Sequence, residues 1–162
     1  MLSLYSYKKH LTTGIDNSIS INESKQKMKQ HAFRLKRGTD LLLAIEEYVN
    51  KNNITAGTIV CCVGCLYKAV IRDAGGKDTV TLDMDVEIVS ITGTLSPDGC
   101  HIHISVSDKD LKTYGGHLMP GCLVNTTAEI VLLELDDYSF KREMDNETGY
   151  KELVIEKSQN WI

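Results

Sequence analysis

The sequence predicts an α+β domain in which one main helix packs on a mostly antiparallel sheet, either curved or closed into a partial barrel. Three observations indicate this class. One segment alone has sustained helical periodicity, the residues after it are rich in β-branched side chains, and the turns between these β-rich runs are short. Because strands and helices do not alternate along the chain, a doubly wound parallel sheet is not expected.

The predicted helix follows a short predicted strand over residues 28–35. Thr39 or Asp40 is suited to cap its first turn, because a short oxygen-bearing side chain accepts hydrogen bonds from the free backbone N–H groups there. Asn52 or Asn53 is suited to end the helix in the left-handed conformation. Between these positions, apolar residues recur at helical spacing and form one stripe: Leu41, Leu42, Ile45, Tyr48 and Val49.

The other strands are predicted from runs of β-branched and aliphatic residues. These runs cover residues 57–72, 84–95, 101–107, 122–135 and 150–157. Gly64 interrupts the first run and predicts a bulge or bend. The segment Ser96-Pro97-Asp98-Gly99 predicts a tight hairpin turn. Residues 108–121 are expected to form a loop.

Length and composition predict one globular domain with a buried core. The chain has 162 residues, of which 42% are hydrophobic and 25% are charged. We expect the domain to span residues 28–157. A polar N-terminal tail at residues 1–27 precedes it and a short C-terminal tail at residues 158–162 follows it, because neither segment has sustained periodicity.

Charge, hydropathy and cysteine content favour a cytoplasmic protein. With a net charge of −4, the chain does not have the excess of basic residues expected of a protein that binds phosphate backbones on its own. No apolar run approaches the ~20 residues of a membrane span, and the first residues show no signal peptide, so no membrane partner is expected. Five cysteines, of which Cys61, Cys62 and Cys65 lie close together, suit a reducing compartment better than a disulfide scaffold.

Three histidines form the candidate metal site. His101 and His103 alternate with Ile102 and Ile104, so that both imidazoles project from one face of a strand, about 6–7 Å apart along it. His117 follows Gly115 and Gly116, and a Gly-Gly pair lets the backbone approach another group closely. Three imidazoles with an open position can hold a metal ion. The alternative is that these side chains only form the solvated face of an amphipathic strand.

Two other groups of residues are weaker candidates. Cys62 and Cys65 match C-x-x-C, but residues three apart face opposite sides of a strand, so we expect structural thiols. Glu129 lies in a strand that is otherwise strongly apolar, where a carboxylate is costly unless it is paired. It could hold a ligating imidazole or pair with a base such as Arg72, and we favour the pairing.

A family resemblance rests on motifs from about Met28 to Glu156. The chain contains HIHIS, then GGHL, then V-x-TTAE, and finally RE-x-D-x-x-TGY-x-EL. This order and spacing resembles the PPC (plants and prokaryotes conserved) domain, which in plants accompanies AT-hook motifs. The chain has no R-G-R-P core of an AT-hook, so it looks like a stand-alone, prokaryotic-type member.

The resemblance implies a fold, an assembly and a ligand set. It implies an α+β sheet with a packed helix, homotrimers, and a DNA-binding role assigned by analogy with plant relatives. It also implies that the three family histidines, associated with zinc in some prokaryotic members, map onto His101, His103 and His117.

The leading hypothesis is therefore a cytoplasmic homotrimer with a three-histidine zinc site. It would act as a regulatory binding protein on DNA or on a protein partner rather than as an enzyme. The alternative is a metal-dependent enzyme that uses metal-activated water on a small substrate, with Glu129 as its general base. A structural assembly domain with incidental histidines is the third hypothesis.

Overall fold

The computed structural model describes residues 28–157, so both predicted tails, 1–27 and 158–162, lie outside the described residues. Within the described range the chain forms nine strands and one helix. In chain order these are β1 (Lys29–Lys36), α1 (Leu41–Lys51), β2 (Gly57–Arg72), β3 (Thr79–Leu82), β4 (Val86–Leu95), β5 (His101–Ser107), β6 (Thr113–Leu118), β7 (Leu123–Glu134), β8 (Tyr138–Met144) and β9 (Lys151–Lys157). Within this range, no helix has the length and apolarity that crossing a membrane requires.

The structure is a β-rich fold, so the predicted α+β class with one main helix is wrong. Strands account for 60% of the described residues and helix for only 8%. α1 has 11 residues, or about three turns, and is too short to form a layer of its own. Moreover, the segment expected to be a loop, residues 108–121, contains β6. The strong helical pattern in the sequence indicates that α1 is amphipathic. It does not indicate what share of the fold is helical.

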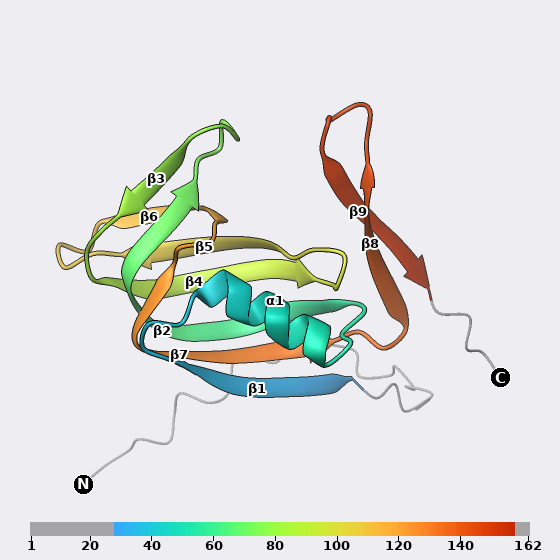
Figure 1. Ribbon diagram of the computed structural model, residues 1–162, viewed down its shortest axis with the longest axis horizontal. Helices are drawn as coiled ribbons and strands as arrows, with labels where there is room; N and C mark the ends of the chain where they lie inside the picture. Colours follow the sequence, from blue (N-terminus) through green and yellow to red (C-terminus); the bar gives the residue numbers. More distant parts are fainter. Residues whose placement is uncertain (1–27, 158–162) are drawn as a thin grey trace, which may run out of the picture.

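Most of the strands form one antiparallel sheet. Its order is β1-β7-β2-β4-β5-β6, and β3 pairs with β2. β2 is 16 residues long, and its last residues also pair with β6, so that the pairings run from β2 through β4, β5 and β6 back to β2. β8 and β9 form a separate two-stranded hairpin, which stands apart from the sheet (Figure 1).

α1 lies across one face of the sheet, and its boundaries follow the sequence signals (Figure 1). The Asp40 side chain accepts a hydrogen bond from the Leu43 N–H at 3.2 Å, as an N-cap does. Asn53 has a φ of 51°, which confirms the predicted left-handed stop. The predicted apolar stripe is also confirmed: Leu41, Leu42, Ile45 and Val49 are buried in the core.

Two predicted backbone features are confirmed by the strand register. The pairing of β2 with β7 shifts between Gly64 and Leu66, where a bulge was expected. A Cβ on Gly64 would lie 2.1 Å from the carbonyl oxygen of Thr127, so the close approach of β7 requires glycine. In the predicted hairpin turn the Gly99 N–H donates to the Ser96 carbonyl at 3.1 Å, and this turn leads from β4 into β5.

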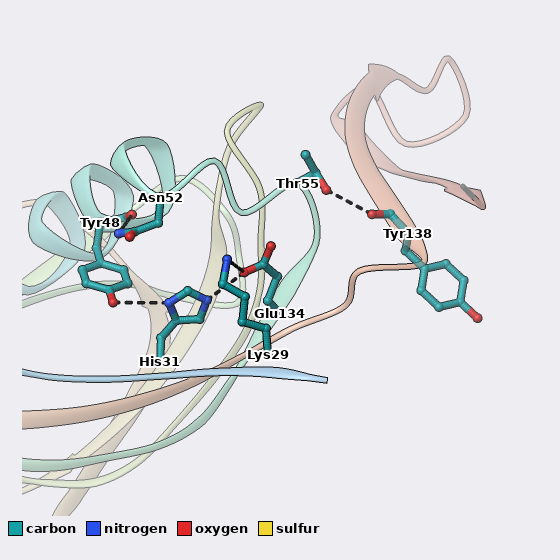
Figure 2. A network of polar contacts seen from close by, with 7 residues as sticks. All are labelled: Lys29, His31, Tyr48, Asn52, Thr55, Glu134 and Tyr138. Atoms are coloured by element: carbon teal, nitrogen blue, oxygen red, sulfur yellow. Dashed lines mark hydrogen bonds and ion pairs between the residues drawn. The ribbon is translucent and has the colours of Figure 1, made fainter. Parts of the chain in front are cut away.

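A polar network at the edge of the sheet ties β1, β7 and α1 together (Figure 2). The buried His31 lies with Nε2 2.8 Å from the Glu134 carboxylate and with Nδ1 3.3 Å from the Tyr48 hydroxyl. Lys29 adds an ion pair to Glu134 at 3.0 Å. Burial acts to raise the pKa of Glu134, but the hydrogen bonds and charges of His31 and Lys29 outweigh it and lower that pKa. The network therefore satisfies the buried polar groups of this edge.

Candidate metal centre

β5 presents its histidines as the alternation of its sequence predicts. Ile102, Ile104 and Val106 are buried, whereas His101 and His103 are exposed. Successive side chains of a strand point to opposite faces, so burial of the three aliphatic residues directs both imidazoles away from the core.

β6 brings the third histidine to the same place. His117 is the register partner of His103 on one side and of Arg72 on the other, because β6 lies between β5 and the end of β2. A Cβ on Gly116 would lie 2.4 Å from the carbonyl oxygen of Arg72. The glycine therefore permits a close approach of two backbones, which is the role expected of the Gly-Gly pair.

The three imidazoles lie close enough to share one ion. The Nε2 atoms of His101 and His103 are 3.2 Å apart. Two nitrogens bound to a tetrahedral zinc ion at ~2.0–2.1 Å lie about 3.3 Å from each other. One ring nitrogen from each of His101, His103 and His117 lies within 4.8 Å of the other two. The donor set therefore fits a three-histidine metal centre after side-chain movement of at most roughly 1.5 Å.

The electrostatics favour the neutral form of two of these imidazoles, His101 and His117. Burial, followed by the nearby charge of Arg72, lowers the pKa of His117 to about 4. Burial and the neighbouring His103 also lower the pKa of His101. A metal ion binds the lone pair of a neutral imidazole, so at neutral pH both rings are in the form that ligation requires.

The histidines open into a cavity of about 760 Å³. Its walls come from the end of β2 with the turn after it, the β4–β5 turn, β5, β6 and the β8–β9 hairpin. Among the described residues, neither Arg72 Nε nor His117 Nδ1 has a hydrogen-bond partner, although both atoms are buried. The hairpin adds Arg142, Tyr150 and Glu152 to the lining.

Glu129 is not part of this centre. It is exposed on β7, where its register partners are Arg34 of β1 and Val63 of β2, and it is not among the residues that line the cavity. The structure therefore brings it neither to the histidines nor to Arg72, the base that the sequence interpretation gave as an example. A cavity carboxylate that sequence reasoning missed is Glu152. The sequence feature that could have identified Glu152 is the closing motif RE-x-D-x-x-TGY-x-EL, which contains Arg142, Tyr150 and Glu152.

The described cysteines are all free thiols. Cys62 is buried, and burial, with a smaller effect of Cys61, raises the pKa of its thiol to about 12. Cys65 is half-buried, with Sγ 3.0 Å from the Thr126 hydroxyl. A thiol with so high a pKa is a poor nucleophile and metal ligand, so Cys62 has the structural role predicted for it.

A family model and several known proteins match this chain. The model is described as the Plants and Prokaryotes Conserved (PCC) domain and matches residues 22–136. The protein named Bifunctional protein GlmU from Synechococcus sp. (strain JA-3-3Ab) is 42% identical over 130 residues, which are 80% of this chain and 21% of that protein. The chain thus spans about a fifth of the length of the curated relatives it matches.

Three solved structures match over nearly their whole length. A hypothetical protein from Salmonella has a TM-score of 0.78 at 36% identity, covering 82% of this chain and 96% of that one. A metal-containing protein from Archaeoglobus fulgidus has a TM-score of 0.66 at 32% identity, covering 78% and 93%. A "putative dna binding protein" from Bacteroides thetaiotaomicron has a TM-score of 0.69 at 21% identity, covering 79% and 96%, which shows a common fold.

Proposed function

Since the chain belongs to the Plants and Prokaryotes Conserved (PCC) domain family, we propose that it is a zinc-binding member of that family with His101, His103 and His117 as ligands. Membership of the family predicted from the sequence motifs is confirmed. The observation that carries the metal proposal is the approach of three imidazole nitrogens to within 4.8 Å of one another. The metal-containing relative from Archaeoglobus fulgidus supports it. Measuring the metal content of the purified protein, and its zinc uptake after chelation, tests it.

If zinc were held by these three imidazoles, it would supply Lewis acidity to a ligand bound in the cavity that they line. The strands of the chain hold the three imidazoles in place. β5 and β6 fix the three imidazoles through their register, and the burial of Ile102 and Ile104 fixes the direction in which β5 presents them.

We expect the domain to act as a homotrimer. The family resemblance implies this assembly, and an exposed apolar surface supports it. Val60 and Val63 of β2 and Val89 of the neighbouring β4 are each more than half exposed. Packing of this patch against further copies of the chain would remove it from water. In a closed, symmetric assembly the patch of every copy would be buried. Light scattering at micromolar concentration should report three times the mass of the chain, and a monomer there would contradict the proposal.

The role proposed for this assembly is regulatory and DNA-associated, with weak DNA binding by each chain. The net charge is −4, and specific binding draws on several phosphate contacts that make log K fall by about 0.9 per contact per log of salt. The densest positive segment comprises Lys25, Lys27, Lys29, Arg34, Lys36 and Arg37. Three copies of it in a trimer would add avidity.

A titration of DNA at several salt concentrations should therefore show salt-sensitive, sequence-tolerant binding by the full chain. Without residues 1–27 we expect no tight binding, because two of the six positive charges are lost. Nanomolar, sequence-selective binding at physiological salt by a chain lacking residues 1–27 would falsify this prediction.

A metal-dependent enzyme remains the second candidate function, and the cavity favours it. Its volume of about 760 Å³ lies within the ~300–1,000 Å³ of typical small-molecule sites. Glu152 lines the cavity and acts electrostatically on His101, whereas Glu129 lies outside the cavity. In this hypothesis Glu152 therefore replaces Glu129 as the general base.

A further inference from the structure

Two arginines line the cavity beside the histidines, although a metal ion there would repel them. Arg72 ends β2 and is the register partner of His117. Arg142 reaches the cavity from β8 and is anchored there, since its NH2 group donates to the Thr94 hydroxyl at 2.8 Å and its backbone N–H donates to Asp98 at 2.6 Å. Cations placed beside a metal centre weaken metal binding unless an anion lies between them.

The charges of the side chains that line the cavity also favour binding of an anion when a divalent metal ion is present. The cavity has three basic side chains, Arg72, Arg142 and Lys151, and three acidic ones, Asp73, Asp98 and Glu152. These balance, so a bound divalent ion would leave the cavity with a net charge of +2. A partly enclosed, uncompensated charge of this size is unfavourable, and an anionic ligand would neutralise it.

Arg72 has hydrogen-bonding capacity for such a ligand. Its Nε atom is buried and, among the residues described, has no hydrogen-bond partner. Buried donors are almost always paired in folded proteins. The guanidinium group presents its donors in a fork that matches the two oxygens of a carboxylate or phosphate group.

The size of the cavity favours a small molecule over a polymer. Its volume of about 760 Å³ suits a ligand of a few tens of atoms at most.

We propose that this cavity binds a small molecule with a carboxylate or phosphate group, which ligates the metal at the open position and accepts hydrogen bonds from Arg72 and Arg142. The proposal rests on the three-histidine zinc site of the proposed function. It adds the chemical class of the ligand and the residues that select it.

Zinc content is measured first, so that the two proposals can fail separately. If the purified protein neither contains zinc nor takes it up, the zinc site is overturned, and this inference with it. If zinc is bound at one ion per chain, calorimetric titrations with phenyl phosphate and benzoate follow, with benzyl alcohol as the neutral control. We expect at least one of the two anions to bind and the alcohol not to bind.

Arginine variants then test the assigned residues. Arg72→Gln should weaken anion binding by about tenfold or more while zinc content is unchanged, because a hydrogen bond to a charged group is lost. Arg72→Lys should recover part of the affinity. Arg142→Gln is the second variant, and Arg34→Gln, an exposed change on β1, is the matched control. Thermal unfolding confirms that each variant folds.

Ligation to the metal has a spectroscopic signature. With cobalt(II) in place of zinc, addition of the anion should change the visible absorption of the metal, because its coordination changes. Zinc-loaded protein that binds neither anion, that binds benzyl alcohol equally well, or that binds anions unchanged in both Arg72→Gln and Arg142→Gln overturns the inference. An unchanged cobalt spectrum on anion binding overturns the direct ligation.

Discussion

Replacing His103 with alanine should remove stoichiometric zinc from the purified protein and leave its fold intact. His103 is close to both other members of the triad, since its Nε2 is 3.2 Å from that of His101 and His117 is its register partner across the strands. Loss of one ligand from three should lower zinc affinity by more than about 100-fold. Substitution of a residue that only hydrogen-bonds to a ligand already lowers metal affinity by about 10–100-fold. Its side chain is exposed, so its removal leaves no cavity in the core.

Metal analysis by mass spectrometry, with circular dichroism to check the fold, measures this effect. Ser105→Ala is the matched control, because Ser105 lies on the same face of β5, two residues further along. It should bind zinc like the native chain. Zinc retained at one ion per chain by the His103→Ala variant would contradict the assignment of the ligands.

Local sequence signals predicted the local parts of this site well. The alternation in β5 depends only on neighbouring residues, and so do the turn at 96–99 and the capping of α1 by Asp40. These features follow from periodicity and from the preferences of single residues, which a sequence displays directly.

The long-range parts could not be predicted in the same way. The segment that forms β6 resembled a loop, because its extended conformation is imposed by pairing with β5 and, at His117 and Leu118, with β2. The position of Arg72 beside His117 depends on that pairing. The cavity depends in addition on the β8–β9 hairpin, which pairs with no strand of the main sheet. Glu129 was misassigned because a polar residue in an apolar run does not reveal which face of the sheet is exposed.

Replacing Gly116 with alanine should damage the metal centre without touching a ligand. The new Cβ would lie 2.4 Å from the Arg72 carbonyl oxygen and 2.8 Å from the Ile71 side chain. Because the first of these is a backbone atom that pairing holds in place, β6 must move away from β2. We expect a loss of about 1–3 kcal/mol in the free energy of unfolding, as for other overpacked sites. Since His117 follows directly, zinc affinity should fall by about tenfold or more.

The adjacent glycine provides the control for this prediction. A Cβ on Gly115 would lie no closer than 3.2 Å to its nearest neighbour, the Ile104 carbonyl oxygen, so Gly115→Ala should cost less than about 1 kcal/mol and retain zinc. Urea unfolding and zinc titration of both variants are compared at one protein concentration, since the stability of the proposed trimer would depend on concentration. Equal effects of the two substitutions would show that the contact between β6 and the end of β2 does not position His117.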